Sequence, residues 1–191
     1  MNETSLSTNS KTIFSIKQLS LVGLMTAIIC VMAPWALPIP FSPVPISLGT
    51  LAIYFVLSVL GMKLGSASII VYILLGLVGL PVFTGFRGGP GTLFGPTGGY
   101  IIGYIFMALI CGFFIDKWGN KLLPCLLGMI LGTAALYTFG SFWLAFQLSY
   151  TLPQAFMVGA IPYIPGDLIK IIIAVVLGGQ LRKRLQKSGL I

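Results

Sequence analysis

Asp167 and Lys170 are the residues of this chain whose types and spacing point most directly to chemistry. They lie three residues apart in an apolar stretch, residues 160–181, that contains no other charged residue. On a helix this spacing places a hydrogen-bond-accepting carboxylate and a donating ammonium on one face. A charge near the centre of a bilayer costs about 2.5–3.5 kcal/mol, so it normally faces a partner, a cavity or a substrate. We expect the pair to line a ligand site; the alternative is an ion pair that only locks its helix in place.

The composition indicates that lipid surrounds most of the chain. Of its 191 residues, 57% are hydrophobic and 7% are charged, whereas about 25% of a typical soluble domain is charged. The predicted fold class is all-α, a polytopic protein of the cell membrane with six transmembrane helices, because six apolar runs approach the length needed to cross about 30 Å of hydrocarbon. These runs are residues 16–33, 46–60, 64–82, 100–115, 122–146 and 160–181.

The basic residues predict the orientation in the membrane, because cations gather on the cytoplasmic side. With the N-terminus inside, nine of the eleven lysines and arginines are cytoplasmic: Lys11, Lys17, Lys63, Lys117, Lys121, Arg182, Lys183, Arg184 and Lys187. This predicts a polar cytoplasmic tail (residues 1–15), a transmembrane substrate-binding domain (16–181) and a basic cytoplasmic tail (182–191). The formal charge of +8 follows from the asymmetry, so membrane lipid is an expected partner and nucleic acid is not.

Several kinds of chemistry are excluded by residues that the chain lacks. It has no histidine, and its three acidic residues are Glu3, Asp116 and Asp167. A His/Cys metal site, a Ser/His/Asp triad and a carboxylate dyad are therefore not expected. No GxxxxGK[ST] motif is present to hold ATP. We expect no catalytic residue, metal or cofactor in this chain, and any ATP-driven work must use another subunit.

Two long loops on the outer side are predicted to be lids or binding loops rather than mere connections. Residues 34–45 contain five prolines and should form a stiff, extended segment, and residues 84–99 contain seven glycines. Glycines such as Gly98 let the backbone approach a bound molecule closely, and Arg87 is placed to clamp an anion. Phe83 and Tyr163 adjoin the expected pocket and are candidates for stacking on a ligand, although belt or core packing is the alternative.

The start of the last span supports an outward-facing pocket. Pro165 and Gly166 directly precede Asp167, so regular helix is expected to begin at Asp167. The helix to residue 181 would then be about 22 Å long, too short for the membrane core. Residues 161–166 would complete the crossing in irregular form, which is tolerated where the backbone lines a cavity.

Four segments of the sequence together resemble the BioY family, the biotin-specific S-components of energy-coupling factor (ECF) transporters. The resemblance extends from about Leu19 to Leu181. Its motifs are Gly79-Leu80-Pro81-Val82-Phe83, Gly88-Gly89, Leu93-Phe94-Gly95-Pro96-Thr97-Gly98-Gly99-Tyr100 and Pro165-Gly166-Asp167-Leu168-Ile169-Lys170. It implies an S-component-like fold that captures biotin from outside and delivers it through a transmembrane coupling protein and two cytoplasmic ATPases.

The resemblance also implies roles for individual residues. Asp167 would accept a ureido N–H of biotin, Lys170 would donate to the carbonyl or the carboxylate, and Arg87 would hold the carboxylate at the mouth. Which cation takes the carboxylate is left open. Gly23 and Ala27 have the small-xxx-small spacing through which the first helix of an S-component docks on the coupling protein, with internal helix packing as the alternative.

Two other functions remain open at the level of the sequence. One is a carrier for biotin or another small solute that works without an ATPase module, since six helices and one site could transport alone. The other is a membrane enzyme with Lys170 as a base. The enzyme is disfavoured because Asp167 would keep Lys170 charged.

Overall fold

Helices make up most of the structure. The computed structural model describes residues 15–40, 42–119 and 121–190. Its elements are α1 (Ile16–Met32), β1 (Ala36–Ile39), β2 (Ser42–Ser47), α2 (Gly49–Leu77), α3 (Pro90–Leu93), α4 (Gly98–Trp118), α5 (Leu122–Leu148), α6 (Leu152–Gly159), the 3₁₀ helix η1 (Ile161–Tyr163) and α7 (Ile164–Lys187). Apart from Ser15, the predicted polar tail lies outside the described residues.

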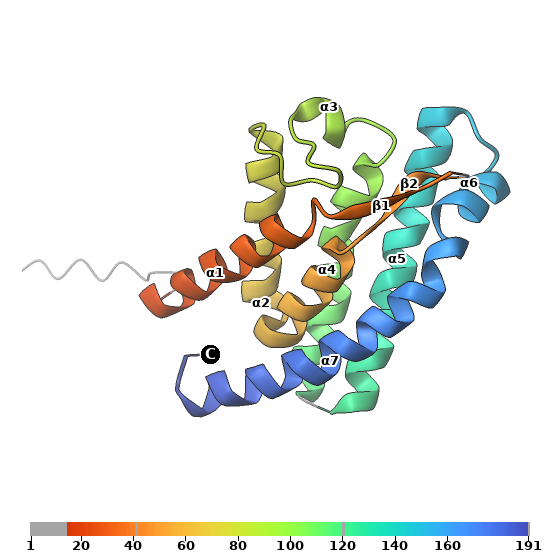
Figure 1. Ribbon diagram of the computed structural model, residues 1–191. Coiled ribbons are helices and arrows are strands. Elements are labelled where there is room, and N and C mark those ends of the chain that lie inside the picture. The colour runs from red at the N-terminus through yellow and green to blue at the C-terminus, as the bar shows by residue number, and fades with distance from the viewer. Residues whose placement is uncertain (1–14, 41, 120, 191) are drawn as a thin grey trace, which may run out of the picture.

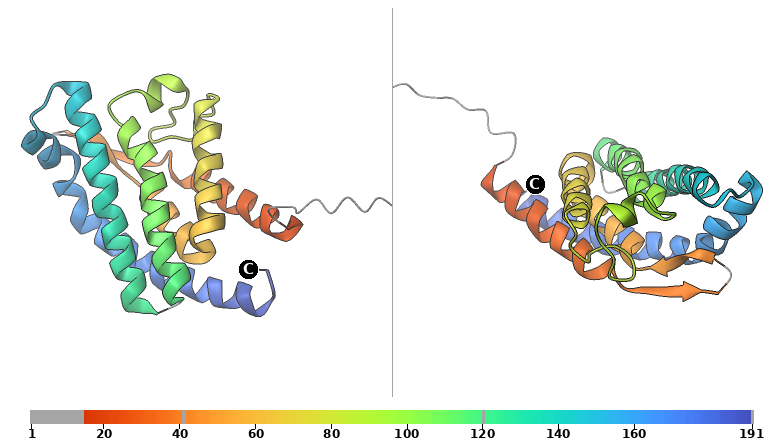
Figure 2. Two further views of the ribbon diagram at one scale, coloured as in Figure 1. Left: turned by 180° about the vertical axis from the view of Figure 1, so that it is seen from behind. Right: turned by 90° about the horizontal axis from the view of Figure 1, so that it is seen from above.

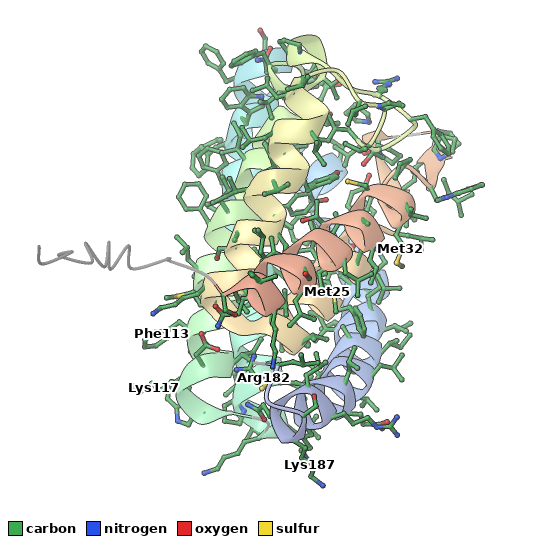
Figure 3. The ribbon with its side chains drawn as sticks, turned by 90° about the vertical axis from the view of Figure 1, so that its left-hand side faces the viewer. Met25, Met32, Phe113, Lys117, Arg182 and Lys187 are labelled. Carbon is green, nitrogen blue, oxygen red and sulfur yellow. The ribbon has the colours of Figure 1, made fainter. Side chains whose placement is uncertain are left out.

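The long helices stand side by side and give the molecule two distinct ends (Figure 1). We call the end with α3, β1 and β2 the outer end. The opposite end, where α4 and α7 finish and α5 begins, is the inner end. Lys117, Arg182 and Lys187 gather at the inner end (Figure 3), which is the side that the sequence predicts to be cytoplasmic. The orientation itself stays a prediction.

The predicted polytopic helical membrane fold is confirmed. Four helical stretches are long and apolar enough to cross a membrane, namely α2, α4, α5 and the stretch from α6 through α7, whereas α1 is apolar but shorter. Large apolar side chains on α7, such as Ile169 and Ile172, are exposed, which suits a surface covered by lipid rather than water. That all six predicted spans cross the membrane stays a prediction.

Helix α2 covers most of two predicted runs, residues 46–60 and 64–82, because it bends sharply at Gly61. Gly61 has φ 74° and ψ −161°, a conformation that glycine adopts readily because it has no Cβ. A Cβ built on Gly65 would lie 3.6 Å from the Cα of Leu57, although eight residues of straight helix span about 12 Å. The two arms of α2, residues 49–60 and 62–77, therefore fold back against each other, as the V of α2 in Figure 1 shows.

The first outer loop adds a small sheet to the helical fold. Residues 34–45 were predicted to be extended, and most of them lie in β1 and β2 or between them. These strands pair antiparallel, with Ala36 opposite Ser47 and Leu37 opposite Ile46. The hairpin runs along one side of the helices and reaches α6 (Figures 1 and 2). Hydrogen bonds described below attach it to the last third of the chain.

The prediction for the start of the last span is wrong. Residues 161–163 form η1, and α7 begins at Ile164 rather than at Asp167. Pro165 and Gly166 are accommodated in the first turn, where the backbone N–H groups have no partner within the helix. Since α7 has 24 residues, it is about 36 Å long and needs no irregular crossing. The predicted basic tail is helical as far as Lys187.

Candidate ligand pocket

A cavity at the outer end brings together most of the predicted site. Its empty space, with the open mouth included, is about 610 Å³. Both outer loops and the helices α2, α4, α5 and α7 contribute to its wall. Of the predicted substrate-binding residues, Phe83, Tyr163, Asp167 and Lys170 line it.

Lys170 uses all of its hydrogen-bonding capacity at the edge of this cavity. Its Nζ lies 2.9 Å from each of three acceptors: Asp167 Oδ1, Thr50 Oγ1 and the carbonyl oxygen of Ser47. An ammonium has three N–H groups, so none is left over. The bond to Ser47 connects α7 to the end of the β hairpin. The predicted ion pair is therefore present, and it also holds part of the outer loop.

Asp167 is surrounded by hydroxyl groups from α2 and α5. Besides Lys170, its Oδ1 accepts a hydrogen bond from Thr50 Oγ1 at 3.1 Å. Its Oδ2 accepts from the hydroxyls of Tyr137 and Tyr54, the latter at 3.4 Å. A carboxylate has about four acceptor positions, and Lys170, Thr50 and Tyr137 fill three of them. The Tyr54 bond is the longest of the four, and that hydroxyl also lies 2.7 Å from Thr133 Oγ1.

The ion pair thus combines the two roles that the sequence left open. Its side chains are only 14% exposed for Lys170 and 3% for Asp167, and its partners tie α7 to α2 and α5. Both residues nevertheless line the cavity. Locking the helices and facing a ligand are therefore compatible, and direct contact with a ligand stays a prediction.

Tyr163 fixes the β hairpin over the cavity. Its hydroxyl donates to the carbonyl oxygen of Val44 and lies 2.7 Å from Ser42 Oγ. Ser42 Oγ in turn donates to the carbonyl oxygen of Val158 at 2.7 Å. The Tyr163 ring lies 6.4 Å from that of Tyr137, centroid to centroid. The hydroxyl is committed to the hairpin, so only the ring is available for the predicted stacking.

Phe83 forms a fixed part of the cavity wall. It is fully buried and packs edge-to-face on Tyr72 at 5.6 Å. A Cβ built on Gly76 would lie 2.1 Å from the Phe83 ring, so only glycine leaves room for the ring there. Phe83 therefore packs in the core, which was the alternative to stacking on a ligand. Its place in the cavity wall is also compatible with ligand contact.

Arg87 and Gly98 lie apart from the main cavity. Arg87 is exposed and lines an adjoining hollow that shares Thr84 and Thr97 with the cavity, so it stands near the mouth. Within the described part of the chain its guanidinium has no ion-pair partner. Packing alone explains why residue 98 is glycine, because a Cβ there would lie 1.7 Å from the carbonyl oxygen of Leu93. Ligand contact by either residue stays a prediction.

Gly23 and Ala27 lie on the face of α1 that points away from the core. Both are exposed, and a Cβ built on Gly23 would meet no atom within 4 Å. The opposite face of α1, including Met25 and Ile29, is buried in the core. Packing among the described residues therefore does not explain the small-xxx-small spacing, which is compatible with docking of another helix.

The hydroxyls around Asp167 were not predicted from the sequence. Thr50 and Tyr54 lie four residues apart on the first arm of α2, and Tyr137 lies on α5. Two hydroxyl-bearing residues four positions apart in an apolar span, as Thr50 and Tyr54 are, could have indicated a polar face on that helix. Over the residues that the structure describes, no group of three or more His, Cys, Asp or Glu side chains is arranged to hold a metal.

Comparison with known proteins places this geometry in a family. A sequence model of the BioY family matches residues 4–187. The chain is 37% identical over 167 residues to the biotin transporter BioY of Thermotoga maritima, covering 87% of this chain and 96% of that relative. It is 36% identical over 179 residues to the biotin transporter BioY of Lactococcus lactis subsp. cremoris, covering 88% and 92%. The crystal structure of the S-component for biotin from an ECF-type ABC transporter matches with a TM-score of 0.82 and 36% identity, over 88% of this chain and 92% of that chain.

Proposed function

The chain belongs to the BioY family, and we propose that it is a biotin-specific S-component, which captures biotin in the outer cavity for an ECF-type transporter. One observation carries the proposal: the Asp167–Lys170 pair is buried yet lines a cavity beneath the outer loops. The relatives at 36–37% identity are named biotin transporters. The chain is accordingly a multi-pass protein of the cell membrane and not an enzyme.

The cavity suits the two halves of biotin. The fused rings and the aliphatic chain need an apolar wall, which Tyr100, Tyr137 and Phe83 supply. The ureido group offers two N–H donors, and Asp167 is the acceptor that we assign to one of them. The Tyr54 hydroxyl has one proton for both Asp167 Oδ2 and Thr133 Oγ1, so its position on the carboxylate is the one open to a ligand. The 3.4 Å bond to Tyr54 is the easiest to replace, since that hydroxyl keeps Thr133 as a partner.

Lys170 and Arg87 have different roles in this proposal. Lys170 can donate to biotin only by releasing one of its three partners, and the Ser47 carbonyl belongs to the hairpin. Ligand binding would then change how the hairpin is held. Arg87 is exposed near the mouth, where its planar guanidinium can bind the ligand carboxylate without displacing a protein group. We therefore assign the carboxylate to Arg87.

The energy for uptake must come from other subunits, because the chain has no ATP-binding loop. We infer that the partners are a transmembrane coupling protein and two cytoplasmic ATPases, and that α1 docks through Gly23 and Ala27. Gly23→Leu and Ala27→Leu should leave biotin binding unchanged and reduce ATP-driven uptake in vesicles with the full module. Leu24→Ala, on the same helix, is the matched control. Unchanged uptake in both leucine variants would move the docking surface elsewhere.

Equilibrium binding of radiolabelled biotin to the purified chain tests the proposal. We expect saturable binding of one biotin per chain, competition by unlabelled biotin and no competition by an unrelated vitamin. Failure of the folded chain to bind biotin would contradict the function. Uptake into vesicles that contain the chain alone would favour a self-sufficient carrier instead.

A further inference from the structure

Tyr104 presents a free hydrogen-bonding group to the cavity. It lies on α4, lines the cavity and is 8% exposed. The hydroxyls of three other cavity-lining tyrosines have partners: Tyr100 lies 3.5 Å from Ser141 Oγ, Tyr137 donates to Asp167 and Tyr163 donates to Val44. The Tyr104 hydroxyl has no partner among residues 15–40, 42–119 and 121–190. Because Tyr104 lines the cavity, its hydroxyl is available to a ligand there.

The position of Tyr104 shows which end of a ligand it would meet. Tyr104 lies six residues into α4, which begins beside the outer loops, so it is about 9 Å below the start of the helix. Arg87 lines the adjoining hollow near the mouth. A ligand that reaches from Arg87 inward would therefore place its far end against Tyr104.

The surroundings of Tyr104 favour a neutral acceptor over a charged one. The nearest cation along the wall, Lys170, already donates all three of its N–H groups and is paired with Asp167. An ionised carboxylate moved to this depth would lack a free cation and would lose its hydration. A carbonyl oxygen carries no net charge, and one hydroxyl donor satisfies it.

We propose that the Tyr104 hydroxyl donates a hydrogen bond to the ureido carbonyl oxygen of biotin. This assignment rests on the proposed function and adds a contact that the ion pair cannot supply, because a carboxylate has no donor and Lys170 already donates all three of its N–H groups. It orients the ligand with its fused rings deep in the cavity and its carboxylate at the mouth. Tyr104 thereby selects for ligands that carry an acceptor at the ureido position.

The test compares Tyr104→Phe with Tyr72→Phe. Each change removes one hydroxyl from a buried tyrosine, but Tyr72 does not line the cavity. We expect Tyr104→Phe to bind biotin about fivefold to tenfold more weakly than wild type, the loss of one neutral hydrogen bond, and Tyr72→Phe to bind normally. Equal affinities for wild type and Tyr104→Phe would overturn the assignment of Tyr104 alone, whereas absence of binding to wild type would overturn the proposed function as well.

A spectroscopic measurement separates a direct contact from a general change in the cavity. Infrared spectra of bound biotin, labelled with carbon-13 at the ureido carbonyl, should show a higher stretching frequency in Tyr104→Phe than in wild type. Incorporation of 3-fluorotyrosine at position 104 keeps the ring and strengthens the donor, so it should lower the frequency. This second variant covers the case in which Tyr104→Phe does not fold. A band that stays in place with 3-fluorotyrosine would contradict the hydrogen bond.

Discussion

The two ion pairs of the described residues have nearly the same length and very different surroundings. The N–O distance is 2.9 Å for Lys170–Asp167 at the outer end and 3.0 Å for Arg182–Asp116 at the inner end. The outer pair is bonded mainly to side-chain hydroxyls and lines a cavity. The inner pair is bonded to the backbone, and its carboxylate side chain is 40% exposed.

The inner pair is explained by the bend in α2. Arg182 Nη1 donates to the carbonyl oxygen of Val59, at the end of the first arm, at 3.2 Å. The N–H of Met62, at the start of the second arm, donates to Asp116 Oδ2 at 3.0 Å. The positive Arg182 thus lies at the C-terminal end of the first arm and the negative Asp116 at the N-terminal end of the second, where each charge complements the helix dipole. A Cβ on Gly61 would lie 2.0 Å from Asp116 Oδ1, so the bend and the pair fit each other.

The difference separates charges that serve the fold from charges that serve a site. At the inner end, the other partners of the ion pair are the Val59 carbonyl and the Met62 N–H, backbone groups that the bend would otherwise leave unpaired. At the outer end, three hydroxyls surround a carboxylate beside an open space that packing does not require. The comparison predicts that changes at the outer pair act on biotin affinity, whereas changes at the inner pair act on stability.

The largest effect on biotin affinity is expected at the outer pair. Asp167→Asn and Lys170→Ala should each weaken binding by about 2–5 kcal/mol, roughly 30-fold or more, because each leaves a buried group without its charged partner. Equilibrium binding to the purified, folded variants measures this. If both variants bind biotin as wild type does, the pair is architecture only.

A smaller effect is expected when Asp167 loses one hydroxyl partner. Tyr137→Phe removes a bond to Oδ2 and should weaken biotin binding by about 1 kcal/mol, or roughly fivefold. Tyr100→Phe is the matched control, since that hydroxyl makes only a 3.5 Å contact with Ser141. Equal losses in the two variants would show that the hydroxyls around Asp167 have no special role.

Arg87 should have a still smaller and selective effect. Arg87→Gln removes the charge at the mouth, where solvent screens it, so we expect a loss of about 0.5–1 kcal/mol for biotin. Binding of a biotin amide, which lacks the negative charge, should be unaffected. Titrations with both ligands provide the measurement, and equal losses for the two would rule out a contact between Arg87 and the carboxylate.

The smallest effect on affinity is expected at the inner pair. Arg182→Met and Asp116→Asn should leave biotin binding unchanged and lower the free energy of unfolding by about 1–3 kcal/mol, because backbone groups at the bend lose their partners. Thermal unfolding in detergent, followed beside biotin titrations below the transition, tests both parts. A large loss of affinity in these variants would erase the distinction between the two pairs.

Features that depend on local sequence were predicted well. The apolar runs located the main helices, and the break between residues 60 and 64 coincides with the bend at Gly61. The spacing of Asp167 and Lys170 predicted that they share one face of a helix, and the structure pairs them there. The start of α7 was missed because Pro165 and Gly166 were expected to precede the regular helix, although the first turn tolerates both.

Features that depend on contacts between distant segments could not be predicted. Thr50 and Asp167 are 117 residues apart in the chain, and nothing in either segment identifies the other. The prolines of residues 34–45 predicted a stiff, extended segment, and nothing in the sequence identified its pairing as a β hairpin. Its pairing uses other residues, such as Ala36 and Ser47. The second ion pair was missed because Arg182 was assigned to a basic tail, whereas α7 carries it back to the bend of α2.

Native mass spectrometry of the purified chain with biotin tests the central claim most directly. The account predicts that wild type and Arg182→Met each retain the mass of one biotin per chain, and that Lys170→Ala retains none under the same conditions. Retention of biotin by Lys170→Ala at the level of wild type, or its absence from wild type, would contradict the claim that the outer ion pair serves a biotin site.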